Sequence, residues 1–572
     1  REKKMDGATI LAKALKNQGI RFCFGIVGIP VSEIAISLQS EGIHFVGMRN
    51  EQAASYAASA IGFLTGHPAV CLVVSGPGLI HAFAGMANAQ ENCWPLIVVG
   101  GSSDEDQEGL GAFQEFPQVD AARKFAKFSA RPSSIDRIPF YVEKAVRWST
   151  YGRPGVSYID LPGTMITGKI PESDFRLGPV CPPPPKPLAC PESISQAIQL
   201  LLSAKQPLII IGKGAAYGRA EKPINRFVTL SQIPFLPTPM GKGVISDNHA
   251  QCVAAARSKA LSGADVILLL GARLNWMLHF GQPPRYRDDV RIIQVDISAE
   301  ELGQNARNPI LLLGDVNSVS EQLVHEWEKE CSGYPRARID DWWGELKQKV
   351  AKNEQNSKEL SLLDQLPMNY YQVFGELRKH LTEDAYIVSE GANTMDIGRT
   401  MLPNALPRHR LDAGTFGTMG VGLGFAIAVA QWLSIEGIQH SKVVCVEGDS
   451  AFGFSAMEYE TACRYNLPIV FIVVNNNGIY SGVDKESWVE ISEDEPSLTL
   501  PPTSLSPEAH YEKFALAFGG RGYFVETPSE LALALGKALS MSTNKPSIIN
   551  VMIDTTAQRK GQEFFWLTKS NL

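Results

Sequence analysis

The stretch Glu447 to Tyr480, EGDSAFGFSAMEYETACRYNLPIVFIVVNNNGIY, links two apolar runs that each end in residues able to bind a cation. Val443–Val446 leads into Gly448-Asp449, and Ile469–Val474 ends in Asn475-Asn476-Asn477. Two such runs with a helical segment between them predict parallel strands, whose carboxyl ends meet at one sheet edge. A carboxylate, an amide oxygen and a backbone carbonyl there suit Mg²⁺, which takes its other ligands from water and phosphate.

Asp449 has a second interpretation, as a cap of the helix that follows it. Ser455-Ala456-Met457-Glu458 has the S-x-x-E pattern of a capping box, so we expect the helix to start there and to leave Asp449 free. The spacing of these residues alone leaves both interpretations open.

Apolar runs of the same kind alternate with helical patterns along the whole chain. They include Cys71–Val74, Pro95–Val99, Leu208–Ile211, Val266–Leu270 and Arg291–Val295. This alternation is typical of an α/β fold with doubly wound parallel sheets, and two breaks divide it into three domains.

The two breaks set the expected domain boundaries. The first contains the run Pro182–Pro185, typical of a stiff linker, and the second contains a charged helical stretch, Lys347–Lys358. We expect a first domain over residues 1–177, a proline-rich linker over 178–192, a central Rossmann-like domain over 193–331, a linker over 332–367, a third domain over 368–556, and a C-terminal tail over 557–572.

The composition excludes several classes of protein. With 44% hydrophobic and 20% charged residues, the 572-residue chain is not an intrinsically disordered one. A net charge of −7 argues against nucleic-acid binding. The nine cysteines contain no C-x-x-C pair, which argues against a zinc site or a disulfide framework. No apolar run reaches the ~18 residues of a membrane span.

The pattern G-D-S followed by N-N resembles the diphosphate-binding segment of the thiamine-diphosphate enzyme superfamily. The resemblance implies that Asp449 and Asn476 bind Mg²⁺ through their side chains and Gly478 through its carbonyl. Gly448 and Ser450 would then lie beside the cofactor's diphosphate. Ser450 replaces a glycine of many members, as it does in the branch that acts on acyl-CoA.

A second cofactor element resembles the pyrimidine-binding helix of the same superfamily. HFVGMRNEQAASYAASAIG contains Glu51, and FGIVGIP at Phe24–Pro30 and SGPG at Ser75–Gly78 support the match. The resemblance implies that Glu51 interacts with the aminopyrimidine ring and activates the cofactor. The alternative is an acid placed favourably at a helix N-terminus. In this superfamily the two halves of the site meet across a subunit interface, which implies a homodimer or homotetramer.

The third element is Gly414–Gly420, GTFGTMG. By resemblance, Met419 is the apolar wedge under the bent cofactor, and the carbonyl of Gly417 accepts a hydrogen bond from the aminopyrimidine. The alternative for a methionine in such a run is ordinary core packing. The glycines at 420, 422 and 424 indicate close helix packing more readily than a nucleotide site.

The resemblance covers Gly7 to Asp554 and is closest to the oxalyl-CoA decarboxylase and 2-hydroxyacyl-CoA lyase branch. Supporting strings are EGANTMDIGR (Glu390–Arg399), RLDAGTFGTMG (Arg410–Gly420) and GARLNW (Gly271–Trp276). The lyases of this branch imply cleavage of long-chain and 3-methyl-branched 2-hydroxyacyl-CoA to formyl-CoA and a shortened aldehyde, in peroxisomal fatty acid α-oxidation. The alternatives are oxalyl-CoA decarboxylation to formyl-CoA and CO2, and a homologue without catalytic activity.

Substrate contacts are expected on loops around the cofactor. Phe113-Gln114 stand where the decarboxylases have Tyr-Glu, which favours the lyase. We expect Gln114 and Tyr480 to contribute to catalysis and Ile29 and Phe113 to line the substrate pocket, although Gln114 could equally be an ordinary loop amide.

Coenzyme A phosphates are expected between the central and third domains. Arg257, Ser258 and Arg399 are the candidates, because arginine binds phosphate oxygens in a bidentate manner. Gly212-Lys213-Gly214, together with Asp296, resembles half of a Rossmann nucleotide site. Related decarboxylases bind ADP there, and in this chain the site could be vestigial.

The C-terminal tail carries two predictions. Phe564-Phe565-Trp566 would give a lid over the site an apolar face, or would simply pack as aromatic contacts. Ser570-Asn571-Leu572 resembles the S-K-L address, which predicts binding to the peroxisomal import receptor and a place in the peroxisomal matrix. If this tripeptide is not read, we expect a cytoplasmic protein.

Overall fold

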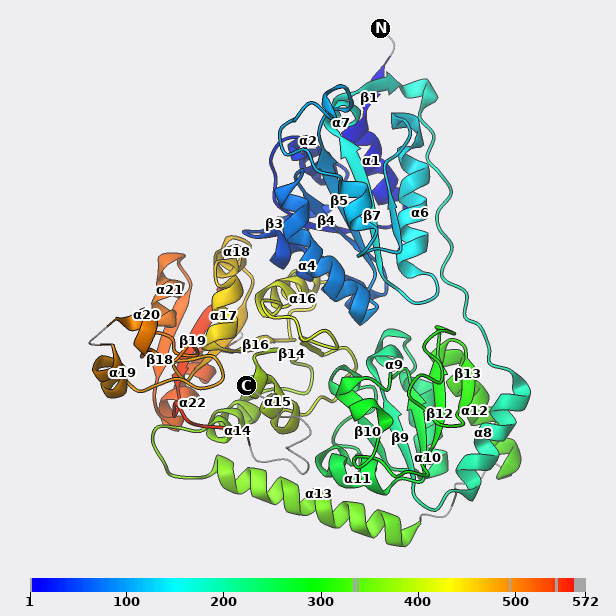
Figure 1. Cartoon of the computed structure of the whole chain (residues 1–572), viewed down its shortest axis with the longest axis vertical. Coiled ribbons are helices and arrows are strands. Elements are labelled where there is room, and N and C mark those ends of the chain that lie inside the picture. The colour runs from blue at the N-terminus through cyan, green and yellow to red at the C-terminus, as the bar shows by residue number, and fades with distance from the viewer. Residues whose placement is uncertain (1–2, 333–335, 337–338, 493–494, 541–543, 560–572) are drawn as a thin grey trace.

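The computed structural model describes residues 3–332, 336, 339–492, 495–540 and 544–559. Three parallel sheets, each covered by helices on both faces, form three domains (Figure 1). This arrangement confirms the predicted α/β fold. No helix in these described ranges is both long and apolar enough to cross a bilayer.

The first sheet has the strand order β3-β2-β4-β5-β7-β6. Its strands are β2 (Phe22–Gly25), β3 (His44–Gly47), β4 (Ala69–Val73), β5 (Leu96–Ser102), β6 (Phe128–Ala130) and β7 (Val156–Pro162). Helices α1 (Gly7–Asn17), α2 (Ser32–Ser40) and α6 (Ile138–Thr150) cover one face, while α3 (Glu51–Thr65), α4 (Pro77–Asn92) and the short α5 (Gln118–Ala122) cover the other. A small antiparallel pair, β1 (Lys4–Asp6) with β8 (Lys169–Pro171), and the short α7 (Gly163–Thr167) complete the domain.

The central sheet has the order β10-β9-β11-β12-β13. Its strands are β9 (Pro207–Ile211), β10 (Phe235–Pro237), β11 (Val266–Leu270), β12 (Arg291–Asp296) and β13 (Ile310–Leu313). Helices α8 (Pro191–Ser203), α9 (Lys213–Tyr217), α10 (Glu221–Ser231) and α12 (Val316–Glu330) lie on one face, and α11 (Arg257–Gly263) lies on the other.

The third sheet has the order β15-β14-β16-β17-β19-β18. Its strands are β14 (Tyr386–Glu390), β15 (Arg410–Asp412), β16 (Val443–Gly448), β17 (Ile469–Asn475), β18 (Arg521–Val525) and β19 (Ser547–Met552). Helices α14 (Tyr370–His380), α15 (Ala392–Met401) and α22 (Pro528–Ala538) pack on one face; α16 (Gly422–Ile435), α17 (Asp449–Ser455), α18 (Glu458–Arg464) and α21 (Tyr511–Ala517) pack on the other. The short helices α19 (Lys485–Ile491) and α20 (Pro496–Thr499) follow β17.

The segment after β16 differs from the sequence expectation. Helix α17 starts at Asp449, and Ser455 is its last residue, so the predicted capping box at Ser455–Glu458 is wrong. The Ser455 hydroxyl is buried without a hydrogen-bond partner, and α18 begins at Glu458 without a side-chain cap. The S-x-x-E pattern is misleading here because Glu458 binds a distant segment instead.

Close helix packing brings the first and third domains together. Helices α3 and α16 lie against each other, and a Cβ at Gly424 would stand 2.7 Å from the Ala53 carbonyl oxygen. Glycine is therefore required for this approach, as the packing interpretation of the 420–424 glycines predicts.

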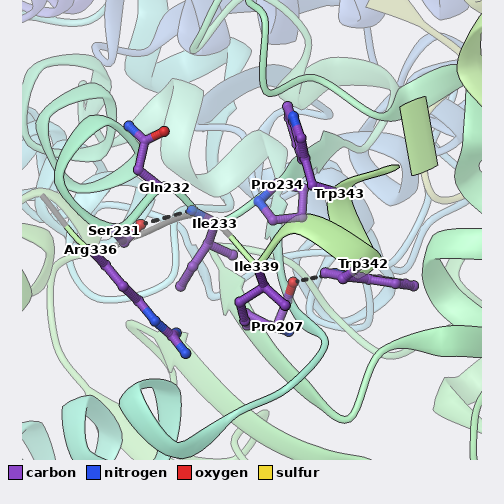
Figure 2. A pocket seen from close by; sticks show the side chains of 9 residues that line it. All are labelled: Pro207, Ser231, Gln232, Ile233, Pro234, Arg336, Ile339, Trp342 and Trp343. Atoms are coloured by element: carbon purple, nitrogen blue, oxygen red, sulfur yellow. Dashed lines mark hydrogen bonds between the residues drawn. The ribbon is translucent and has the colours of Figure 1, made fainter. Parts of the chain in front are cut away.

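The second break contains a long helix, α13 (Asp340–Ser361), which includes the predicted stretch Lys347–Lys358. Trp342, Trp343 and Leu346 are buried against the central domain, and the Trp342 indole nitrogen donates to the Pro207 carbonyl at 3.0 Å. Figure 2 shows Trp342 and Trp343 beside a small void that Pro207, Ile233 and Arg336 also line. Two tryptophans thus attach the linker to the central sheet.

Replacing Trp342 by Ala should weaken this attachment. We expect the unfolding transition of the central domain to lose about 3–5 kcal/mol, the usual cost of deleting a buried Trp side chain. Trp342→Phe should lose less, because it keeps most ring contacts. Calorimetry on the full chain measures both. Lys352→Ala, at an exposed position of the same helix, should stay within about 0.5 kcal/mol; equal losses in Trp342→Ala and this control would contradict the assignment.

Candidate active site

Asp449 and Asn476 lie at the carboxyl edge of the third sheet, directly after the neighbouring strands β16 and β17. Asp449 is 2% exposed, and its carboxylate accepts hydrogen bonds from the backbone N–H groups of Ser450 (2.8 Å) and Gly478 (3.0 Å). The Asn476 amide nitrogen donates to the Tyr480 carbonyl at 3.0 Å, so its amide oxygen is the atom that could bind a cation. The fold therefore brings together Gly448, Asp449, Ser450, Asn476 and Gly478.

These residues fit a hard cation. Burial raises the pKa of Asp449 to about 7, and a bound cation would favour its charged form. Among the described residues, no group of three or more His, Cys, Asp or Glu side chains is placed to hold a metal ion. One carboxylate with amide and carbonyl oxygens is a donor set that suits Mg²⁺ completed by phosphate and water.

The loop before α16 carries Gly417 and Met419. Gly417 has φ +68°, and a Cβ there would meet nothing within 4 Å, so this turn borders open space. Met419 remains 36% exposed, which argues against the ordinary core interpretation and fits a wedge under a ligand.

Glu390 holds this loop by accepting hydrogen bonds from its backbone. It ends β14, is fully buried, and accepts hydrogen bonds from the backbone N–H groups of Gly420 and Gly422, the latter at 2.7 Å. Glu390 is the first residue of EGANTMDIGR, but no local sequence pattern predicted a role for it. The sequence feature that could have indicated it is an acidic residue at the end of an apolar run. Asp449 likewise follows an apolar run.

Glu390 lies beside a second buried acid, Glu447, its register partner on β16. The Cβ position of Gly422 is 1.7 Å from a Glu447 carboxyl oxygen and 3.0 Å from a Glu390 carboxyl oxygen, so only glycine fits. Burial raises the pKa of Glu390 to about 7, and burial with the Glu390 charge raises that of Glu447 well above its ordinary value. Burial beside Glu390 therefore favours the protonated form of Glu447.

Glu51 opens α3, as predicted. The Asn50 side chain caps the helix by accepting from the Gln52 N–H at 2.7 Å. One carboxyl oxygen of Glu51 lies 3.0 Å from Nδ1 of His81, and the other lies 3.5 Å from the Cβ position of Gly78 in α4. The Glu51 side chain is 12% exposed. A partly exposed carboxyl group so placed is a candidate proton-sharing group.

Glu458 fixes the segment that leads into Glu51. One of its carboxyl oxygens accepts from the N–H groups of both Arg49 and Asn50 at 3.0 Å, and the other accepts from the Thr461 hydroxyl at 2.8 Å. The acid belongs to α18, so it joins the first and third domains. Sequence reasoning missed it because no local pattern reports a contact across 400 residues.

The predicted substrate residues lie in turns and bends of the first and third domains. Gln114 has φ +55°, its backbone packs on Gly76 at the start of α4, and its side-chain oxygen is buried without a partner. That orphaned acceptor favours a ligand contact over an ordinary loop amide. Ile29 (77% exposed), Phe113 (72%) and Tyr480 (50%) present uncovered side chains.

The three candidates for coenzyme A contacts differ in their surroundings. Arg399 is paired with two carboxylates, Asp412 at 3.0 Å and Asp396 at 3.1 Å, so its charge is already neutralised. Arg257 donates to the Met277 carbonyl, while its Nε is buried without a partner. Ser258 is half-buried in α11 beside it. Arg257 is therefore the better phosphate candidate of the two arginines.

Lys213, in the half-Rossmann segment, serves as a contact between domains. Its ammonium donates to the Asn92 side chain of the first domain and to the Thr415 hydroxyl of the third, the latter at 2.9 Å. Burial lowers the pKa of Lys213 to about 7. Asp296 accepts from the Ser298 N–H at 2.8 Å. These contacts use the Lys213 ammonium and one carboxyl oxygen of Asp296. The predicted lid residues and Ser570-Asn571-Leu572 lie outside the described residues.

Comparison with known proteins gives three family matches. They are the thiamine pyrophosphate enzyme N-terminal TPP binding domain (residues 5–122), central domain (194–323) and C-terminal TPP binding domain (390–551). The chain is 58% identical over 572 residues to 2-hydroxyacyl-CoA lyase 1 of Mus musculus and 57% to that of Homo sapiens, in each case over 100% of this chain and 98% of the relative. It is 41% identical over 574 residues to oxalyl-CoA decarboxylase of Escherichia coli K12, over 99% of this chain and 97% of that protein. These two mammalian lyases are thus more similar in sequence to this chain than the Escherichia coli decarboxylase is.

The contact between Glu458 and the Arg49–Asn50 segment predicts a pH dependence of stability. Burial raises the pKa of Glu458 to about 7, so the folded state binds this proton more tightly than the unfolded chain does. The resulting stabilisation, up to about 3 kcal/mol, is complete below the unfolded pKa and is lost as the pH rises through about 7.

Glu458→Gln keeps an oxygen acceptor but no longer titrates. We expect it to flatten the fall in unfolding free energy between about pH 4, near the unfolded pKa, and about pH 7, the folded pKa, measured by denaturant titration. Glu460→Gln, on the same helix, is the control, because Arg464 lowers the pKa of Glu460 and its loss must not flatten that slope. An unchanged slope in Glu458→Gln would contradict the assignment.

Proposed function

The chain belongs to the thiamine pyrophosphate enzyme family, and we propose that it is a thiamine-diphosphate-dependent 2-hydroxyacyl-CoA lyase. The proposed reaction cleaves the bond between C1 and C2 of a 2-hydroxyacyl-CoA, releasing formyl-CoA and an aldehyde one carbon shorter. The observation that carries this proposal is the 58% identity to a 2-hydroxyacyl-CoA lyase along the whole chain, against 41% for an oxalyl-CoA decarboxylase.

Thiamine diphosphate supplies an electron sink that stabilises the charge left when the carbon–carbon bond breaks. Asp449, Asn476 and Gly478 would hold the diphosphate through Mg²⁺, with Gly448 and Ser450 beside it. Met419 and Gly417 would support and orient the rings. Glu51 would share a proton with the aminopyrimidine, since its partly exposed side chain at the start of α3 can reach a ligand.

Substrate residues follow from the orphaned and exposed groups. The buried oxygen of Gln114 would accept a hydrogen bond from the substrate hydroxyl, and Tyr480 would lie near the reacting carbons. Ile29 and Phe113 are apolar and uncovered, so they suit a long or 3-methyl-branched acyl chain. Arg257, with Ser258 and Arg399 nearby, would meet the phosphates of coenzyme A.

Assembly and location complete the proposal. We propose a homodimer or homotetramer with the site at a subunit interface, supported by the apolar side chains left exposed around Met419 and Tyr480. Peroxisomal import and a role in fatty acid α-oxidation rest on Ser570-Asn571-Leu572 and its resemblance to the S-K-L address.

The proposal predicts one product pattern. With Mg²⁺ and thiamine diphosphate, 2-hydroxyoctadecanoyl-CoA should give aldehyde and formyl-CoA in equal amounts, measured by mass spectrometry. Oxalyl-CoA, offered separately, should release CO2 at a far lower rate. Reactions without Mg²⁺ or without cofactor are the controls. CO2 and formyl-CoA from oxalyl-CoA alone would reassign the protein as a decarboxylase.

Glu51→Gln should retain cofactor but lose over about 100-fold in turnover, because an amide cannot share a proton as a carboxyl group does. Cofactor affinity by calorimetry and turnover on the same preparation separate the two effects. Glu33→Gln is the matched control, since Glu33 is an exposed acid in the first turn of α2. Turnover unchanged in Glu51→Gln would show that Glu51 is only a helix-terminal charge.

A further inference from the structure

His81 stands next to Glu51 and has no part in the function proposed so far. It lies on α4, one turn after Gly78, and its side chain is 54% exposed. We propose that His81 is a positioning residue that holds one oxygen of the Glu51 carboxyl group and leaves the other to the cofactor. This inference rests on the proposed function, in which Glu51 activates thiamine diphosphate.

The hydrogen bond assigns different roles to the two oxygens of Glu51. Nδ1 of His81 lies 3.0 Å from Oε2, while Oε1 lies over Gly78, 3.5 Å from the position a Cβ would take. Where the Glu51 carboxylate accepts this hydrogen bond, Nδ1 carries the proton. Oε2 is then occupied by the chain itself, and Oε1 is the oxygen left for the aminopyrimidine.

Without His81 the carboxyl group would lose its anchor. Glu458 and the Asn50 cap fix the backbone around Glu51 but not its side-chain torsions. In the described part of the chain, His81 is the one side chain that forms a hydrogen bond with the Glu51 carboxyl. A long side chain with one anchor samples several rotamers, and few of these present Oε1 to a bound ring.

A role confined to stability does not explain the contact. The His81 ring is more than half exposed, and exposed ion pairs contribute little to folding. A loss of His81 should therefore leave the fold intact and change mainly the orientation of Glu51.

The test measures cofactor activation without any acyl-CoA. Full-length protein with Mg²⁺ and thiamine diphosphate is mixed with D2O and quenched in acid, and exchange of the cofactor C2 proton is followed by NMR. We expect His81→Ala to slow this exchange about tenfold, the effect of losing one hydrogen bond to a charged group. Cofactor affinity should change less than about threefold.

Conservative replacement separates positioning from structure. The amide nitrogen of Asn can take the place of Nδ1, so His81→Asn should recover exchange to within about threefold of the unaltered chain. His440→Ala is the control, because His440 lies 3.7 Å from a carboxylate, Asp384, on an exposed surface. It should leave the exchange rate unchanged.

The outcomes are distinct. Unchanged exchange in His81→Ala, or equal loss of exchange and cofactor affinity in both His81 variants, would overturn the inference. If Glu51→Gln exchanges at the rate of the unaltered chain, the premise falls and the inference falls with it. If exchange is normal but no 2-hydroxyacyl-CoA is cleaved, the lyase proposal fails and the role of His81 stands.

Discussion

The burial of three acids at one sheet edge is the constraint on which the site depends. Glu390 ends β14, Glu447 lies in the neighbouring parallel strand β16, and Asp449 directly follows β16. Each of the three acids is at most 2% exposed. Negative charge in such a place requires nearby donors, a retained proton or a cation. Backbone N–H groups of Gly420 and Gly422 donate to Glu390, and burial favours the protonated form of Glu447. Backbone N–H groups of Ser450 and Gly478 donate to Asp449, where we propose Mg²⁺ as the counterion. The backbone of the loop that carries Met419 is thus held by its hydrogen bonds to the buried Glu390 carboxyl group.

Much of the fold follows from local sequence patterns. The apolar runs predicted as strands match β4, β5, β9, β11, β12, β16 and β17 to within three residues at each end. Buried parallel strands are nearly continuous apolar segments, so their signal survives without knowledge of their neighbours. The same reasoning located Asp449 and Asn476, because the ends of parallel strands gather at one edge.

Contacts between distant segments were not predictable in this way. The capping-box pattern at Ser455 failed because Glu458, which should have capped a helix, binds the N–H groups of Arg49 and Asn50 in another domain. His81 offers no local signal either: it lies on a helix whose apolar spacing is ordinary, and its partner Glu51 is 30 residues away in another element. Such pairs arise from packing, which a single sequence does not display.

Lys213 belongs to the central domain, and its ammonium donates to Asn92 in the first domain and to Thr415 in the third. Replacing the lysine would remove one hydrogen-bond donor from each of these two groups. Central domains from relatives are therefore not freely interchangeable modules: a chimera must bring a lysine at this position, or change Asn92 and Thr415 with it. Recombination within this chain is therefore restricted at Lys213, whose partner Thr415 lies in the loop that carries Gly417 and Met419.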